Sequence, residues 1–193
     1  MKRKFTVVIF VSFIVILFLN SCSLRGARMI PRSFDNDQNI ANARMDKVLE
    51  AIQNKDKDAL KALFSPKAIA EAEEFDQSII DLFDYFQGDF ISYNDQSAIN
   101  VEEGLNDDGT GRRWKALYST YDLETSNQEY RIAIKDFTVD TANSNNVGIY
   151  SFYIIKLEDD PDPKIAYRGD DKYTPGINFN IKNVLPEESI IGN

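Results

Sequence analysis

The chain has 193 residues, with 22 basic and 31 acidic side chains, one cysteine and no histidine, and its net charge is −9. The acidic balance argues against nucleic acid as a partner, because nucleic acid is bound by clustered Lys and Arg. Without histidine there is no imidazole for a nucleophilic triad, and with one cysteine there is no internal disulfide and no usual ligand set for zinc, copper or iron.

Residues 1–21 have the composition of an export signal. Three basic residues at positions 2–4 precede an apolar run from Phe5 to Leu19. This run of about fifteen residues is shorter than the roughly twenty that a helix needs to cross a bilayer. We therefore predict a signal peptide over residues 1–21 that is removed from the mature protein.

The signal leads into Leu19-Asn20-Ser21-Cys22, which resembles the bacterial lipobox. The resemblance implies cleavage after Ser21 and lipidation of Cys22, the single cysteine. Two or three acyl chains would anchor the protein stably to the extracytoplasmic face of the cell membrane. The alternative is an uncleaved N-terminal anchor helix in which Cys22 has no role.

The mature chain divides into a tether and one domain. Residues 22–39 are polar and irregular and predict a flexible tether, and residues 40–193 are long enough for a single domain with a sizeable core. Without the three basic signal residues, 19 basic side chains face 31 acidic ones, so the mature net charge is −12.

The first part of the domain has helical spacing of apolar residues. We predict a first helix over residues 38–54, and a short second helix that begins at Asp56 as its N-cap. Ser65-Pro66 predicts the start of a third helix, with Ser65 as N-cap and proline in the first turn. Its apolar side runs without a break to Phe86, and Gly88 is expected to end it.

After Gly88 the pattern changes to alternation, with frequent β-branched and aromatic residues, which predicts strands. Their predicted ranges are 89–101, 112–124, 128–140 and 146–158. The last of these is apolar on both faces and should be the most central strand, with Gly148 allowing a bend or a close backbone approach. Alternation at 177–181 predicts a final edge segment.

Helices followed by long antiparallel strands predict an α+β fold, with the helices packed on one face of a strongly curved sheet. Over residues 40–158 this order resembles the cystatin-like cone of the nuclear-transport-factor-2-like superfamily. The segments Asn146–Ser151, Ala166-Tyr167 and Lys172–Ile177 are similar to a family of mostly Gram-positive lipoproteins designated domain of unknown function 5104. The resemblance implies a fold and a location, and it brings no activity.

The chain contains no glycine-rich phosphate loop, no nucleophile elbow and no His-Glu-x-x-His helix. We expect no cofactor and no metal. Calcium is the one metal whose oxygen ligands are present, but the acidic clusters at residues 107–108 and 158–162 lack EF-hand spacing and are better explained as solvated turns.

Side chains that could line a binding pocket are large, polar or aromatic and lie on the predicted strands: Trp114, Tyr118, Asp122, Tyr130, Tyr150 and Tyr153. Trp114, Tyr118 and Asp122 share one face of their strand, because strand side chains alternate. Folds similar to the cone place an Asp base and a Tyr hydrogen-bond donor around a small apolar substrate, so the resemblance implies that Asp122 and Tyr118 could serve an isomerase or hydratase. The alternative is an aromatic-rich strand with Asp122 near its exposed end.

These features favour a non-catalytic binding module, held at the membrane by Cys22, for a small molecule, a peptide or an envelope protein. One alternative is a cone-fold enzyme that uses Asp122 and Tyr118. Another is a structural or protective lipoprotein that binds one protein partner.

Overall fold

The computed structural model describes residues 34–96, 98–105, 110–160 and 172–179. Residues 1–33, which include the predicted signal peptide and Cys22, lie outside the described residues. The described chain is an α+β domain, with helices first and a six-stranded sheet afterwards, as predicted. Within this part of the chain, no helix has the length and apolar character required to cross a membrane.

The helical part comprises α2 (Phe34–Gln53), α3 (Lys57–Ala62), α4 (Pro66–Glu71) and α5 (Phe75–Tyr85). The predicted N-caps are confirmed. Asp56 accepts a hydrogen bond from the backbone N–H of Ala59 at 2.9 Å, and Ser65 Oγ accepts one from Ala68 at 3.1 Å. These contacts satisfy backbone donors that the first turn of a helix leaves free.

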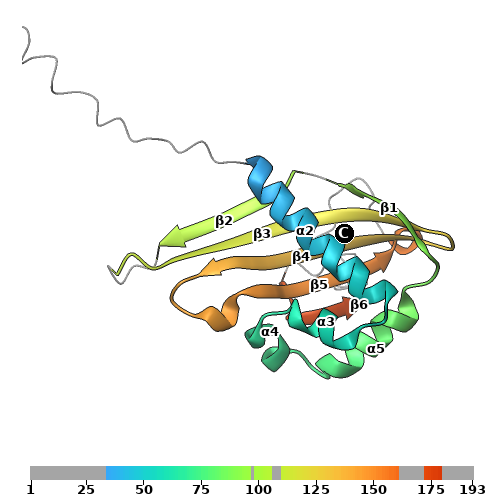
Figure 1. The fold of residues 1–193 in the computed structure, drawn as a ribbon, viewed down its shortest axis with the longest axis horizontal. Coiled ribbons are helices and arrows are strands. Elements are labelled where there is room, and N and C mark those ends of the chain that lie inside the picture. The colour runs from blue at the N-terminus through green and yellow to red at the C-terminus, as the bar shows by residue number, and fades with distance from the viewer. Residues whose placement is uncertain (1–33, 97, 106–109, 161–171, 180–193) are drawn as a thin grey trace, which may run out of the picture. The chain divides into compact units, whose positions relative to one another are not determined.

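The sheet comprises β1 (Phe90–Asp95), β2 (Asn100–Leu105), β3 (Arg113–Thr125), β4 (Glu129–Asp140), β5 (Gly148–Lys156) and β6 (Gly176–Phe179). Its order is β1-β3-β4-β5-β6, and β2 also pairs with β3 (Figure 1). All pairs are antiparallel except β5 with β6. Two short 3-10 helices, Ser144–Asn146 and Leu157–Asp159, flank β5.

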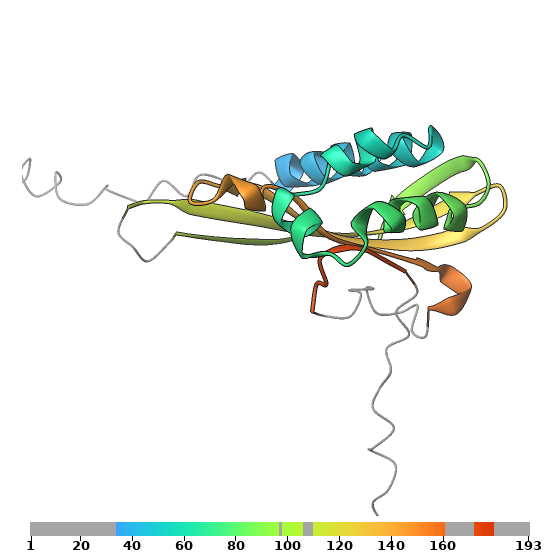
Figure 2. The same ribbon diagram turned by 90° about the horizontal axis from the view of Figure 1, so that it is seen from below.

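The helices lie on one side of the sheet (Figure 2). The main core fills the space between the two layers, and it joins Met45 and Leu49 of α2 and Ile79 of α5 to Tyr121 and Ile132 of the sheet. The opposite side carries no described α-helix, only the short 3-10 helix Leu157–Asp159, and we call it the helix-free face. The segment that precedes β6 lies on this side.

Two helix predictions were wrong. Helix α2 begins at Phe34, so residues 34–39, predicted as tether, are helical. The start of α2 is polar and has no apolar stripe that would predict a helix. It is held to the sheet by an ion pair instead, in which the buried Asp37 contacts Lys115 at 2.5 Å. The predicted third helix is two helices, since the chain breaks between α4 and α5, where Glu74 adopts a left-handed φ of 45°.

Two strand predictions were also wrong. The predicted strand 89–101 is two strands, which pair with opposite ends of β3. The middle of the sheet is β4 and not β5. Strand β5 is apolar on both faces, and both faces are covered. The segment before β6 contacts the second face, where the backbone N–H of Thr174 donates a hydrogen bond to the hydroxyl of Tyr153. The predicted edge position of the final strand is confirmed.

Candidate functional site

Half-buried aromatic side chains gather around a lysine on the helix-free face. The ammonium Nζ of Lys135 in β4 lies 4.6 Å from the ring centroid of Tyr173, 5.2 Å from Tyr118, 5.4 Å from Phe137 and 5.7 Å from Tyr150. These are cation–π distances. We call these five residues the aromatic-lysine cluster.

Strand pairing explains why these residues meet. Tyr118 of β3 is the register partner of Lys135 in β4, and Phe137 follows Lys135 by two residues on the same face. Tyr150 is the extra residue of a β-bulge, since Lys135 pairs with Ser151 and Asp136 with Ile149. Bulges redirect side chains, and the ring of Tyr150 meets that of Phe137 edge to face, with centroids 6.1 Å apart.

Trp114 extends the cluster along β3. Its ring centroid lies 6.4 Å from that of Phe137. The indole also lies against the backbone of Gly104 in β2, where an added Cβ would come within 2.9 Å of the indole Nε1. Glycine at this position therefore gives Trp114 the space to lie over the neighbouring strand.

Tyr173 reaches the cluster from outside the antiparallel strands. It precedes β6 and has a φ of 56°, a left-handed conformation that costs a non-glycine residue about 1 kcal/mol. Its ring lies 5.0 Å from that of Tyr118, measured between centroids. The strained backbone thus coincides with the residue that stands closest to the Lys135 ammonium.

The two outer tyrosines of the cluster donate to carboxylates. Tyr118 Oη donates to Glu102 at 2.6 Å, and Tyr150 Oη donates to Glu71 at 2.9 Å. Burial, followed by the contact with the carboxylate, raises the pKa of both phenols above 10.0. Both tyrosines are therefore neutral hydrogen-bond donors at physiological pH.

Lys135 differs from the other charged groups of this face. Among the described residues, no carboxylate lies within 4.0 Å of its ammonium and no acceptor forms a hydrogen bond with it. Burial lowers the pKa of Lys135, and the negative charge of Glu102 opposes this shift. The site therefore holds a partly desolvated cation between aromatic walls.

Asp122 also lies on the helix-free face, but it is ion-paired. Arg131 donates to both of its carboxylate oxygens, at 2.6 and 2.9 Å, and a third bond of 2.6 Å joins Arg131 to Asp160. The Arg131 side chain is 2 % exposed. Asp122 lies four residue positions after Tyr118, about 13 Å along β3. The two side chains are therefore not placed to act on neighbouring atoms of a small substrate.

Tyr153 and Tyr130 have other surroundings. Tyr153 is 1 % exposed, and its hydroxyl accepts the Thr174 N–H at 2.8 Å, so it supports the segment before β6. Tyr130 lies on the helix side, stacked on Phe86 with centroids 5.3 Å apart. Its hydroxyl donates to the carbonyl of Tyr85 at 2.9 Å. The structure therefore brings together Trp114, Tyr118 and Tyr150 of the six predicted residues.

The acidic clusters provide no metal site within the described chain. Asp160 forms an ion pair with Arg131. Residues 107–108 and 161–162 lie outside the described residues. Over the ranges that the structure describes, no group of three or more Cys, Asp or Glu side chains is arranged to hold a metal ion.

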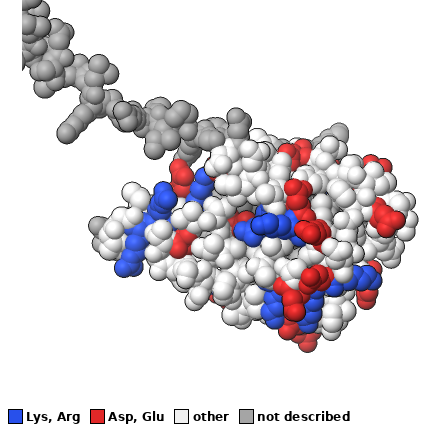
Figure 3. Space-filling view, viewed as in Figure 1, with Lys and Arg blue, Asp and Glu red and all other residues white. Residues whose placement is uncertain are grey.

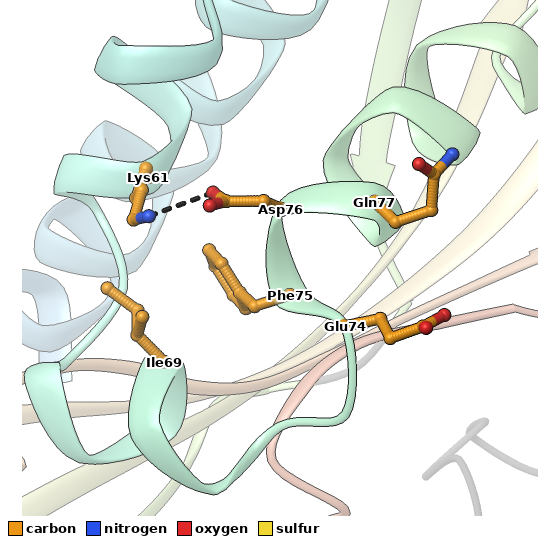
Figure 4. A pocket seen from close by; sticks show the side chains of 6 residues that line it. All are labelled: Lys61, Ile69, Glu74, Phe75, Asp76 and Gln77. Atoms are coloured by element: carbon orange, nitrogen blue, oxygen red, sulfur yellow. Dashed lines mark hydrogen bonds and ion pairs between the residues drawn. The ribbon is translucent and has the colours of Figure 1, made fainter.

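A pocket of about 570 Å³ lies between α3, α4 and α5 (Figure 4). It is lined by Lys61, Ile69, Glu74, Phe75, Asp76 and Gln77. Lys61 and Asp76 point toward each other and form an ion pair of 2.8 Å, which lowers the pKa of this exposed carboxyl. None of the six side chains predicted to line a binding pocket lies here, and Lys61 already has an ion-pair partner, so we do not assign this pocket a ligand.

Charge on the helix-covered face is mixed. Lys and Arg lie next to Asp and Glu in Figure 3, without an extended area of one sign. Pairs such as Lys61 with Asp76 and Lys67 with Glu71 account for this pattern on the helices. The residues that the structure describes on this face therefore form no extended basic surface of the kind that binds nucleic acid.

Sequence reasoning missed three members of the cluster, Lys135, Phe137 and Tyr173. The alternation of β4 contains a usable signal, because it places Lys135 and Phe137 on one face with Arg131. Tyr173 precedes a strand of four residues and has no periodic neighbours, so no sequence pattern predicts its position.

Fold and site together define an α+β domain with a helical layer on one face of an open sheet and an aromatic-lysine cluster on the other. The chain belongs to the family described as a domain of unknown function (DUF5104), which matches residues 47–157, more than half of the sequence. The match contains Tyr118, Lys135, Phe137 and Tyr150 and ends before Tyr173. No curated protein matches the sequence significantly.

Proposed function

We propose that this protein is a non-catalytic binding module that is anchored by lipidated Cys22 to the extracytoplasmic face of the cell membrane. Its ligand is a small molecule, a peptide or an envelope protein, and it binds at the aromatic-lysine cluster. The lipobox-like segment before Cys22 supports the location. The helix-first order and the helical layer on one sheet face also support kinship with the nuclear-transport-factor-2-like cone.

One observation carries the proposed site. Four half-buried aromatic rings surround Lys135: three come from β3, β4 and β5, and the fourth comes from the segment before β6. Glu71 of α4 contacts the rim of the cluster through Tyr150. Aromatic side chains beside a few placed polar groups are typical of ligand sites. By contrast, the enzyme alternative requires Asp122 as a base, and both oxygens of Asp122 accept hydrogen bonds from Arg131.

The single tryptophan permits a direct test. Trp114 is the one tryptophan of the chain and packs against the cluster through Phe137, so fluorotryptophan labelling of the full-length protein in lipid nanodiscs gives one fluorine NMR signal. We expect envelope metabolites or peptides that bind to shift this signal. Tyr118→Ala should abolish the shift, and Tyr85→Ala, on the helix side, should retain it.

Co-purification from solubilised envelopes separates a protein ligand from a small one. A protein partner that is captured by the wild type and lost with Tyr118→Ala identifies the protein-binding form of the module. A Trp114 signal that stays unchanged across the metabolite and peptide library, with no envelope protein captured, would contradict the proposal.

A further inference from the structure

We infer that the aromatic-lysine cluster binds a small organic anion with an apolar body, whose acidic group pairs with Lys135. This inference rests on the proposed function and specifies the ligand class of the same site. It follows from three features of the cluster: the charge state of its groups, the occupancy of its hydrogen-bonding groups and the character of its walls.

The first feature is the lysine itself. An ammonium has three N–H donors and no acceptor, and that of Lys135 has no acceptor among the described residues. Two other partly buried cations of the sheet are paired, Lys115 with Asp37 and Arg131 with Asp122, and the third, Lys156, lies over a single ring, that of Tyr85. A partly buried cation without a partner costs stability, so an anion from outside would be stabilised here.

The second feature is that the nearby carboxylates are engaged. Glu102 accepts from Tyr118 at 2.6 Å, and Glu71 accepts from Tyr150 at 2.9 Å and lies 4.0 Å from Lys67. Each tyrosine therefore holds a carboxylate at the rim while its ring faces Lys135. A ligand anion is the group that supplies the missing acceptor.

The third feature is the apolar character of the aromatic rings around the ammonium. The rings of Tyr118, Phe137, Tyr150 and Tyr173 present apolar surface around the ammonium, and Trp114 continues this surface beyond Phe137. An inorganic anion would gain nothing from these rings, and a ligand cation would meet the charge of Lys135. An anion attached to an apolar body matches both parts of the site.

The test uses three probes with the same phenyl body: phenyl phosphate, phenylacetate and the neutral phenylethanol. Each is titrated into the full-length fluorotryptophan-labelled protein in nanodiscs. We expect the anions to bind about tenfold more tightly than the alcohol, because a hydrogen bond to a charged group is the stronger kind. The order of phosphate and carboxylate then distinguishes phosphate-bearing ligands from carboxylate-bearing ones.

Lys135→Met should remove the preference for the anions, so that the anions bind no more tightly than phenylethanol. Lys135→Arg, which retains the charge, should keep the preference. Lys156→Met is the matched control, since Lys156 lies on the other face over a single ring, that of Tyr85, at 6.0 Å. Thermal unfolding of each variant checks that methionine, similar in length and without a charge to desolvate, leaves Tm unchanged or higher.

Equal binding of anions and alcohol to the wild type would overturn the inference and leave the proposed binding site standing. The inference would also be overturned if Lys135→Met lowered Tm and weakened the binding of all three probes alike, because Lys135 would then support the fold. If no probe shifts the Trp114 signal, the inference is wrong, and the metabolite and co-purification tests decide the proposed function separately.

Discussion

Gly148 is the residue at which β5 meets the turn between α3 and α4. Its φ is 124°, and an added Cβ would come within 2.7 Å of the Ser65 nitrogen and 3.0 Å of the Phe64 carbonyl carbon. On either side of this approach, Ser65 N–H donates to the Ile149 carbonyl and Ile149 N–H donates to Leu63, both at 2.9 Å. The predicted close backbone approach is confirmed, and glycine is what permits it.

We therefore expect Gly148→Ala to lower the free energy of unfolding by about 3 kcal/mol, because backbone strain and a clash with backbone atoms add. Urea denaturation measures the change. Gly111→Ala is the control, since Gly111 also has a positive φ, 71°, but an added Cβ meets nothing within 4 Å. It should cost only about 1 kcal/mol. Equal costs for the two variants would show that the contact with Ser65 is unimportant.

At the scale of elements, α2 is fastened to the sheet by polar contacts as well as by apolar packing. Arg44 Nε donates to Asp136 of β4 at 2.8 Å, and Tyr93 of β1 donates to Asp46 at 2.8 Å. The Asp136 side chain is only 4 % exposed. Burial raises the pKa of Asp136, and Arg44 opposes this shift.

Arg44→Met should lower the free energy of unfolding by roughly 3 kcal/mol at neutral pH, because it leaves a buried carboxylate without its partner. A carboxyl whose folded pKa is raised binds more protons in the folded state, so its contribution is favourable at low pH and is lost as pH rises through the folded pKa. Removing Arg44 raises that pKa further. The deficit of the variant should therefore shrink as the pH is lowered through the folded pKa of Asp136.

Urea denaturation of wild type and variant at neutral and mildly acidic pH checks this sign. Adding Asp136→Asn to Arg44→Met removes the buried charge and should recover much of the stability at neutral pH. A deficit that does not depend on pH, or that persists in the double variant, would mean that Arg44 acts through packing of its aliphatic chain.

The sequence predicts the long strands well because their alternation is local. Predicted ranges of 112–124 and 128–140 compare with Arg113–Thr125 and Glu129–Asp140. The same reasoning does not detect the break between α4 and α5, since Ile69, Ala72, Phe75 and Ile79 keep a helical spacing of three or four residues through it. Its cause is tertiary: the backbone of Gly176 in β6 approaches Ala72 so closely that an added Cβ would lie 2.6 Å from that of Ala72.

At the scale of the whole molecule, the candidate site depends on how strands pair and which face the helices cover. Alternation places Trp114 and Tyr118 on one face of β3, and the structure agrees. Alternation does not indicate which face the helices cover, so the sequence predicts Tyr130 as a pocket residue together with Trp114 and Tyr118, although Tyr130 packs against Phe86 on the helix side. Tyr173 joins the site because it precedes β6, and no local sequence pattern predicts that β6 pairs in parallel with β5.

The proposed attachment of the molecule to the membrane depends on Cys22, which lies outside the described residues. Because the chain has one cysteine, no other thiol can accept the lipid. We expect Cys22→Ala to release the protein from the membrane fraction or to leave the precursor unprocessed. Fractionation with mass spectrometry of the N-terminal peptide measures both. Ser23→Ala, which retains the sulfur, should behave as the wild type, and unchanged retention and processing of Cys22→Ala would refute the lipid anchor.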